Sequence, residues 1–376
     1  MAIEIREIKQ TNKDLGKFIR FSTDLYEGNP YYVPDLQFDE IGNMKSSQNP
    51  AFDFCESIYY MAYRDGKAVG RIAGIINNQV NERSNSKTVR FGYVDFIDDS
   101  EVVDALFNAV ADWAKAKGLN EMVGPLGFTD LDKEGMLIEG YDQIGTMSTI
   151  YNHPYYVEHM KRLGFEQDAQ WNEFKIMIPD AIPEKHMKIS QIISKRYEVR
   201  NVHFKSKKEL AAKYGRDLFR LINEAYDQLY GYSPLTERQI TYYLKMYVPI
   251  VKLENLSVIV DKDDNLVGLG LAMPSLSKAL IKSRGRLFPF GWYHLLKGLK
   301  GKNDVIDLLL VAVKSEYQSK GVNALLFTDL IPQFQKAGYV FAESNPELDY
   351  NNRVQSQWQY FDTTLHKRRC TFKKSI

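Results

Sequence analysis

The order of apolar and polar positions predicts the same series of elements twice along the chain. Glu4–Ile8 alternates apolar and polar side chains as a half-buried strand does, and Glu198–Val202 repeats this pattern. Each of these strands is followed by a Lys-bearing turn and a helical segment, Leu15–Tyr26 in the first copy and Leu210–Tyr226 in the second. We therefore expect two copies of one α/β plan.

Each copy continues with a predicted hairpin. In the first copy, Ile58–Tyr63 and Ala68–Ile75 are apolar-rich runs separated by Arg-Asp-Gly-Lys. In the second copy, Leu256–Val260 and Leu266–Leu271 are separated by Asp-Lys-Asp-Asp-Asn. Asp-Gly and Asp-Asn supply the positive φ angles that tight hairpin turns need.

A strand, a helix and a second strand are expected after each hairpin. Their predicted ranges are Val89–Ile97, Glu101–Lys117 and Glu121–Val123 in the first copy, and Val305–Val313, Val322–Lys336 and Tyr339–Glu343 in the second. The predicted fold class is α/β, with a mixed sheet in each of two tandem domains. We place the domains at residues 1–182 and 183–376.

Composition limits the classes of protein to consider. The chain has 376 residues, of which 44% are hydrophobic and 26% charged, as is usual for soluble globular proteins. A net charge of +1 provides no overall field that would attract nucleic acid. The charged N-terminus does not resemble a secretion signal, and no apolar run approaches the roughly 18 residues of a membrane span. We expect a cytoplasmic protein without a transmembrane segment, and two isolated cysteines, Cys55 and Cys370, predict neither a metal site nor a disulfide framework.

The candidate chemistry lies after the apolar run Leu308–Val313. A short polar loop, Gln318–Gly321, leads from this strand into the next predicted helix. The first N–H groups of a helix are unpaired and favour anions. Lys320 adds a positive charge, and no carboxylate occurs between Gln318 and Asp329. The stretch predicts a phosphate-binding loop, with a plain strand–helix connection as the alternative.

The corresponding loop of the first copy has the opposite charge. Asp98, Asp99 and Glu101 cluster where the helix begins. Two like charges about 4 Å apart repel by around 4 kcal/mol at an effective dielectric constant near 20. We therefore expect residues 1–182 to form a degenerate copy that does not bind a phosphate-bearing cofactor.

The loop also resembles a family motif, Gln/Arg-x-x-Gly-x-Gly/Ala at the start of a helix. It matches at Gln318 and Gly321 and departs at Asn323, where the family prefers Gly or Ala. Tyr151–Phe165, and more loosely Asn351–Phe361, resemble the Asn-led helix of the same family. With the order of elements, these motifs resemble the GNAT superfamily of acyl-CoA-dependent N-acyltransferases, in a tandem arrangement of two domains. The resemblance implies that two central parallel strands of the sheet splay apart.

The resemblance also implies a cofactor and a reaction. The cofactor is acetyl-CoA or another acyl-CoA, bound by residues 183–376, and the reaction is N-acylation, with acetyl favoured, of a small-molecule or peptide amine. The implied cofactor-binding residues are Val311, Ala312, Val313, Gln318, Ser319, Lys320, Gly321, Val322, Asn323 and Ala324. Backbone N–H groups around Val311–Val313 are expected to bind the thioester oxygen.

Two catalytic residues are predicted. Glu343 ends a strand where the cleft should open, and is the candidate base; Asp307 is a second candidate. Tyr360 follows Asn352 by eight residues, close to the spacing at which the family places a tyrosine that faces the leaving thiolate. The alternatives are a solvated strand-end carboxylate for Glu343 and a core or surface role for Tyr360.

Three further alternatives stay open. The donor could be a fatty-acyl group, or an aminoacyl-tRNA, in which case nucleic acid would bind; or the chain could be a non-catalytic binding module. Residues 277–303 hold seven cations and no acid around an aromatic run, which fits a lid, a membrane-surface segment, a docking site or a solvated face. The basic tail Lys367–Lys374 is expected to form a last strand with charged edges.

Overall fold

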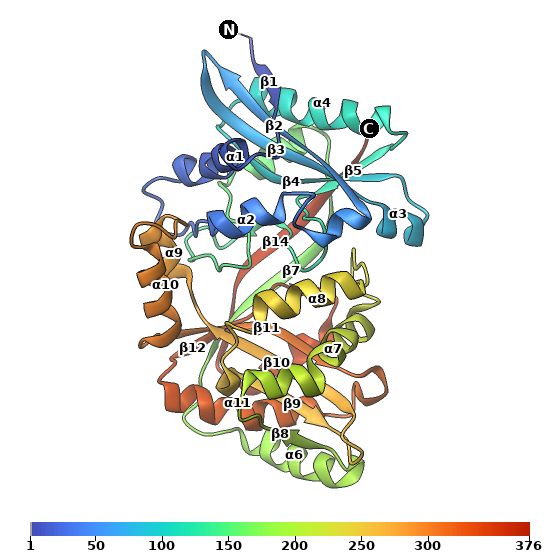
Figure 1. Ribbon diagram of the computed structural model, residues 1–376, viewed down its shortest axis with the longest axis vertical. Helices are drawn as coiled ribbons and strands as arrows, with labels where there is room; N and C mark the ends of the chain where they lie inside the picture. Colours follow the sequence, from blue (N-terminus) through green and yellow to red (C-terminus); the bar gives the residue numbers. More distant parts are fainter. Residues whose placement is uncertain (1) are drawn as a thin grey trace. The chain divides into compact units, whose positions relative to one another are not determined.

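The computed structural model describes residues 2–376, which divide into two compact units (Figure 1). The first unit holds the residues up to Asn172, together with Leu276–Lys297 and His366–Ile376. The second holds Glu173–Ser275 and Gly298–Leu365. The chain leaves the first unit shortly before the boundary placed between residues 182 and 183. The sequence pattern did not indicate that two later segments return to the first unit.

The first unit is a mixed sheet with helices on both faces. Its strand order is β1-β2-β3-β4-β5-β14-β7, with β4 and β5 parallel. Its strands are β1 (Glu4–Glu7), β2 (Cys55–Arg64), β3 (Lys67–Asn77), β4 (Thr88–Phe96), β5 (Glu121–Gly124), β6 (Met136–Glu139), the start of β7 (Glu166–Met177) and most of β14 (Thr363–Ser375). Its helices are α1 (Asn12–Leu25), α2 (Gln37–Asn43), α3 (Asn78–Ser84), α4 (Ser100–Ala116), α5 (Tyr155–Arg162), α9 (Ser277–Ser283) and most of α10 (Gly291–Lys300).

The second unit repeats this plan. The end of β7 pairs with β12, and the order continues β11-β10-β9-β8, with β11 and β12 parallel. Its other strands are β8 (Arg200–Val202), β9 (Leu256–Val260), β10 (Leu266–Pro274), β11 (Val305–Val313), β12 (Phe341–Glu343) and β13 (Glu347–Leu348). Its helices are α6 (Glu184–Tyr197), α7 (Lys207–Tyr226), α8 (Glu237–Tyr247), α11 (Asn323–Ala337) and α12 (Asn352–Gln355), the last followed by a 3₁₀ turn over Ser356–Tyr360.

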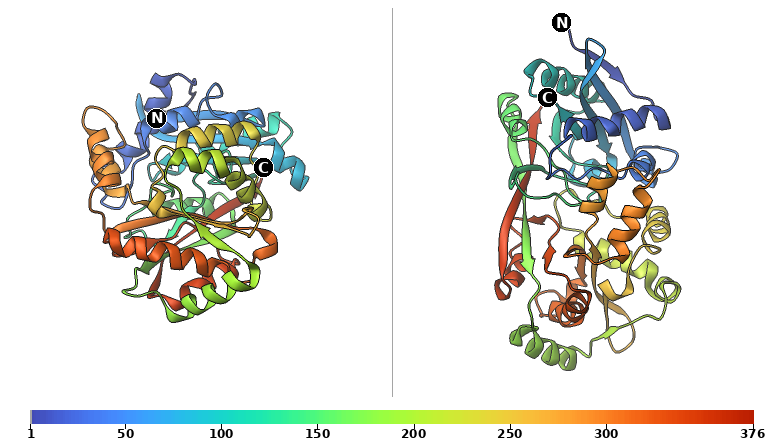
Figure 2. Two further views of the ribbon diagram at one scale, coloured as in Figure 1. Left: turned by 60° about the horizontal axis from the view of Figure 1, so that its bottom comes forward. Right: turned by 90° about the vertical axis from the view of Figure 1, so that its left-hand side faces the viewer.

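Alternate strand residues show that the sheet of the second unit is covered on both faces. Val258 and Val260 of β9 pack in one cluster with α7, while Ile259 packs with α6 and α11 in another. Successive side chains of a strand point to opposite faces, and every residue of β9 is buried. α6 and α11 lie side by side on one face, and α7 covers the other with α8 packed against it (Figure 2). The predicted α/β class, with a mixed sheet and two tandem copies of one plan, is confirmed.

The C-terminal segment forms a last strand, β14, as expected, but this strand does not lie at a sheet edge. β14 pairs with β5 over Phe372–Ser375 and lies inside the sheet of the first unit. Lys367 and Arg369 are buried, because their long side chains donate to loop carbonyls: Lys367 to Ile144, and Arg369 to Gly135 and Ile150. Charge on this strand therefore does not mark an edge.

Within the described residues, no helix combines the length and apolar character needed to cross a membrane.

Candidate active site

The two central parallel strands of the second unit separate after three residue pairs. β11 and β12 are paired from Val305 to Asp307. The register between β10 and β11 then shifts, which leaves Leu309 as an extra residue in β11. A bulge of this kind bends its strand and ends regular pairing. Beyond it, Val311 is 42% exposed although it lies on a central strand.

The open edge of β11 presents backbone groups of alternate residues. Lys314 donates its N–H to Val267 of the neighbouring β10. Because backbone groups alternate between the two edges of a strand, the N–H groups of Val311 and Val313 point away from β10. These are the groups that could donate to a ligand lying along the open edge.

Side chains bind the carbonyl groups along this edge. The Tyr226 hydroxyl donates to the Val311 oxygen, and the Gln318 amide donates to the Val313 oxygen, both at 3.1 Å. Asn345, just after β12, donates to the Leu309 oxygen. Gln318, predicted to contact the cofactor, thus also holds its loop against the end of β11.

The loop that follows has two residues with positive φ, Ser319 at 59° and Gly321 at 80°. A Cβ atom at Gly321 would lie 3.1 Å from the Ile189 side chain of α6. Gly321 is therefore needed for its backbone angle and for packing against α6. The Lys320 ammonium lies 5.1 Å from the ring centre of Tyr197 and 5.5 Å from that of Tyr317, which keeps the charge at the loop.

The α11 helix begins at Asn323 without a side-chain cap and without an acidic residue in its first turn. Its cap position is Val322, which cannot accept a hydrogen bond through its side chain. The Asn323 amide donates to Gln357 at 2.7 Å, away from the helix N–H groups. The partial positive charge at this end of α11 is therefore available to bind an anion.

The equivalent helix end in the first unit is occupied by the chain itself. Asp99 Oδ1 accepts the N–H groups of Glu101 and Val102 at the start of α4. Arg64 pairs with the same carboxylate at 2.6 Å, and this contact and the backbone bonds hold the pKa of Asp99 below its usual value. A phosphate at this helix end would have to displace a well-held carboxylate.

The gap beyond β4 and β5 in the first unit is also filled. Leu126 donates its N–H to the Phe91 oxygen at 2.9 Å. A Cβ atom at Gly92 would come within 2.3 Å of the Leu126 oxygen, so the segment after β5 lies directly on β4. In the described part of the first unit, the segment after β5 thus occupies the edge of β4 that corresponds to the open edge of β11.

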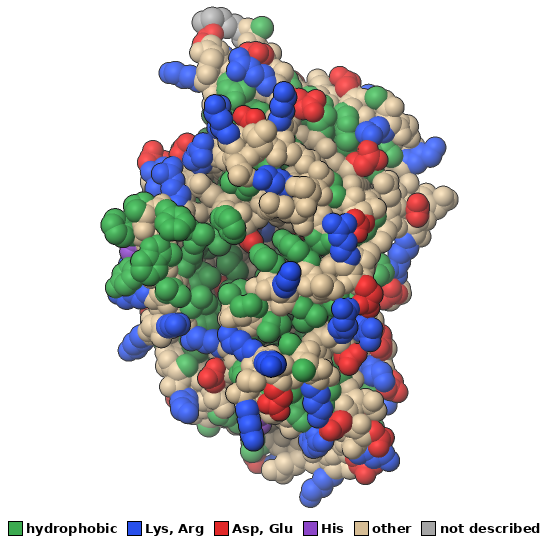
Figure 3. Space-filling view, in the orientation of Figure 1, with side chains coloured by type: hydrophobic (Ala, Val, Ile, Leu, Met, Phe, Trp, Pro, Cys, Tyr) green, Lys and Arg blue, Asp and Glu red, His purple; other side chains and the backbone are tan. Residues whose placement is uncertain are grey.

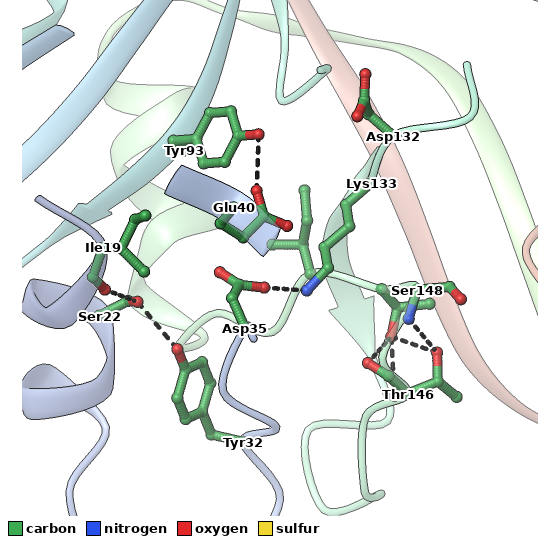
Figure 4. A network of polar contacts seen from close by, with 12 residues as sticks. Ile19, Ser22, Tyr32, Asp35, Glu40, Tyr93, Asp132, Lys133, Thr146 and Ser148 are labelled. Atoms are coloured by element: carbon green, nitrogen blue, oxygen red, sulfur yellow. Dashed lines mark hydrogen bonds and ion pairs between the residues drawn. The ribbon is translucent and has the colours of Figure 1, made fainter. Parts of the chain in front are cut away.

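A polar cluster in the first unit lies near this filled gap (Figure 4). Asp35 pairs with Lys133, and the Tyr93 hydroxyl donates to Glu40 at 3.0 Å. Burial raises the pKa of Glu40 to about 8. Asp132 accepts from Asn43 and from the backbone of Thr129. These contacts tie α2 to the loop after β5 and account for the cluster structurally.

The two predicted catalytic residues have different surroundings. Glu343 is buried in β12, opposite Asp307 of β11. Tyr360 is partly exposed and lies against α6, where Lys185 donates to its hydroxyl and the His186 ring packs edge-on against it. Their catalytic roles stay predictions.

One further acidic residue near the open edge was missed from sequence. Glu347 begins the short strand β13, two residues after Asn345, whose side chain donates to the Leu309 oxygen; Trp358 donates its indole N–H to the Glu347 carboxylate at 3.0 Å. Burial raises the pKa of Glu347 to about 8. The sequence around it, Asn-Pro-Glu-Leu, is an ordinary loop pattern, and the tryptophan that encloses the carboxylate comes eleven residues later.

Solved structures match this arrangement along the whole chain. A tandem GNAT protein from the clavulanic acid biosynthesis pathway superposes with a TM-score of 0.58 at 10% identity, over 100% of this chain and 98% of that one. The chain has the tandem GNAT fold. A GCN5-related N-acetyltransferase from Sphaerobacter thermophilus shares this fold, with a TM-score of 0.53 at 13% identity over 99% and 95% of the two chains.

Curated proteins also match this chain by sequence. Protein YghO of Escherichia coli K12 is 27% identical over 372 residues, 96% of this chain and 93% of that protein. A bacterial ceramide synthase of Caulobacter vibrioides is 25% identical over 316 residues, 82% of this chain and 80% of that protein. No family model matches the chain.

Proposed function

We propose that the protein is an acyl-CoA-dependent N-acyltransferase whose donor binds in the second unit. The observation that carries the proposal is the difference between two equivalent helix ends. α4 is capped by Asp99, whereas α11 has no side-chain cap and lies beside Lys320. A diphosphate needs unpaired N–H groups and positive charge, and only the second of these helix ends offers both.

The open edge of β11 fits the rest of such a donor. An extended amide-bearing arm can lie along a strand edge as an added strand. When bound, acyl-CoA supplies an acyl group activated as a thioester. The N–H groups of Val311 and Val313 would then donate to the carbonyl oxygen, where negative charge develops as the amine attacks.

We assign the general base to Glu347. The amine must lose a proton as its nitrogen bonds to the acyl carbon, and the carbon–sulfur bond then breaks to release the thiol. A base works best when its pKa lies near the working pH, and that of Glu347 is raised to about 8 by burial. Glu343 remains the alternative base, and Tyr360 the proposed acid that protonates the leaving sulfur.

Two candidates differ in the length of the acyl chain that is transferred. The family resemblance alone favours acetyl. The relative named as a ceramide synthase favours a second candidate, because ceramide is an amide of a fatty acid with a long-chain amino alcohol. Under this candidate the donor is a fatty acyl-CoA and the acceptor a long-chain amine.

A thiol-release assay tests both candidates. Wild-type protein is incubated with acyl-CoA donors from acetyl to long-chain, each with an amino acid, a polyamine, a peptide and a long-chain amino alcohol. Amine-dependent release of thiol, with formation of the amide detected by mass spectrometry, is expected for at least one pair. A strict preference for acetyl-CoA would remove the fatty-acyl candidate, and no amide with any pair would contradict the proposed function.

A further inference from the structure

An exposed aromatic segment stands out on the surface of the first unit. Phe288 is 77% exposed and Phe290 is 70% exposed, far more than is usual for phenylalanine. Their neighbours on α10 are also exposed: Trp292, Tyr293 and Leu296. Figure 3 shows the resulting apolar cluster over the α9–α10 region, at the left of the view. Contiguous apolar surface of this kind marks a site of interaction.

The charge of the same segment has one sign. Leu276–Lys297 contains five cations and no acidic residue, although the whole chain carries a net charge of only +1. Arg284 is paired with Asp24 and Glu27. Among the residues that the structure describes, Lys282, Arg286 and Lys297 form no ion pair, and all three are exposed. The apolar cluster is thus bordered by unpaired positive charge.

Two hydrogen bonds hold the segment against the rest of the first unit. The Ser277 hydroxyl donates to the Gly145 oxygen at 2.9 Å, and Gln37 donates its N–H to the Gly285 oxygen at 2.9 Å. Phe38, the neighbour of Gln37, is itself 71% exposed. These two hydrogen bonds hold the segment in place and do not involve its aromatic side chains, which remain exposed.

The helix within the segment carries aromatic and basic side chains on neighbouring faces. Trp292 and Leu296 are four residues apart and share one face of α10, and Tyr293 and Lys297 form the adjacent stripe. Trp, Tyr and Phe together with Lys are enriched where proteins meet the polar layer of a bilayer. Protein–protein contacts, by contrast, are depleted in lysine.

We propose that this aromatic-basic segment, Leu276–Lys297 with Phe38, docks the protein peripherally on an anionic lipid bilayer. The aromatic rings enter the headgroup layer, and Lys282, Arg286 and Lys297 attract the anionic headgroups. The proposal does not depend on the identity of the acyl donor or of the acceptor.

Co-sedimentation of the full chain with lipid vesicles tests the proposal. Vesicles of phosphatidylcholine mixed with phosphatidylglycerol should bind the wild-type protein, and added salt should weaken this binding. Vesicles of phosphatidylcholine alone should bind far less. Binding to neither kind of vesicle, or equal binding to both, would overturn the proposal.

Two triple variants separate the contributions. Phe288→Ser with Phe290→Ser and Trp292→Ser should lower the partition coefficient about tenfold or more. Lys282→Glu with Arg286→Glu and Lys297→Glu should lower it on the order of a hundredfold on anionic vesicles. Since all six side chains are exposed, the melting temperature of each variant should equal that of the wild type.

Matched controls carry the same changes elsewhere on the surface. The apolar control replaces exposed Ile192, Met246 and Ile250 with Ser, and the charge control replaces exposed Lys115, Lys208 and Lys245 with Glu. Both controls should retain most of the binding. Equal loss in test and control variants would overturn the proposal. So would a wild-type dimer, seen by sedimentation without vesicles, that the aromatic variant alone dissociates.

Discussion

Trp358 donates its indole N–H to both carboxylate oxygens of Glu347, at 3.0 and 3.2 Å. The contact stabilises the charged carboxylate, yet burial outweighs it and raises the pKa of Glu347 to about 8. With this pKa, the carboxyl group of Glu347 is mostly protonated at neutral pH and can accept a proton, as a carboxylate, in mildly alkaline solution. The hydrogen bond from Trp358 therefore affects the pKa of Glu347 and, through it, the pH dependence of the proposed reaction.

The first prediction concerns this pH dependence. Since the base must be unprotonated, kcat/KM of the wild type should rise with pH and level off above about 8. Glu347→Gln should lower kcat by about a hundredfold or more and remove this limb of the profile. Glu343→Gln is the comparison variant. If it removes the limb and Glu347→Gln does not, Glu343 is the base.

Trp358→Phe provides a second readout for the same group. Loss of the indole donor removes the contact that favours the carboxylate, so the pKa of Glu347 should rise further and the limb should move to higher pH. If the pH profile of kcat/KM is the same in Trp358→Phe and in the wild type, Glu347 is not the group that titrates.

The second prediction concerns the charge at the start of α11. Lys320→Glu should weaken acyl-CoA binding by about ten- to a hundredfold, because it replaces the cation beside the helix end with an anion. Lys336→Glu, in the last turn of the same helix, is the matched control and should leave binding unchanged. Isothermal titration calorimetry measures both, and equal affinities for the two variants would argue against a phosphate site at this loop.

The third prediction concerns the first unit. Asp99→Ala removes the cap of α4 and the partner of Arg64, so the free energy of unfolding should fall by about 1–2 kcal/mol. Urea denaturation measures this loss. If the first unit binds no acyl-CoA, the variant should retain wild-type affinity and the same stoichiometry. A second binding site that appears once Asp99 is removed would show that the carboxylate alone blocks it.

The sequence predicted the fold because each element has its own local pattern. The alternation in β1 and β8, the apolar run of β11 and the polar loop that follows it are all read within a few residues. The difference between the two helix ends also follows from local charge. These features do not depend on distant contacts, so the sequence of each segment is enough to predict them.

The features that the sequence did not indicate depend on distant partners. Lys367 and Arg369 are buried because carbonyl groups more than 200 residues earlier accept their hydrogen bonds. Glu347 is a candidate base only because Trp358 and the surrounding loop remove water from it. Gly321 was identified as part of the motif, whereas its positive φ and its packing against Ile189 of α6 were not predicted.

The fourth prediction concerns the buried ion pair of the first unit. Arg71 donates to Asp95 at 2.8 Å and to the Phe18 oxygen, and Tyr26 donates to the other oxygen of Asp95. Arg71→Met leaves the carboxylate without its countercharge and should cost about 3–5 kcal/mol of stability.

The double variant Arg71→Met with Asp95→Leu is the control for that prediction. It removes both charges and should recover a large part of the loss, as followed by thermal or urea unfolding. If the double variant is less stable than the single variant, the hydrogen bonds of Tyr26 and its neighbours, and not the ion pair, carry the stability.

Amide hydrogen exchange with a non-hydrolysable thioether analogue of acyl-CoA tests the central claim most directly. If the donor lies along β11 and at the start of α11, the analogue should slow exchange over residues 311–325 and leave residues 95–102 unchanged. Slowed exchange at residues 95–102 alone, or no change at residues 311–325 when the protein is saturated with the analogue, would contradict the account.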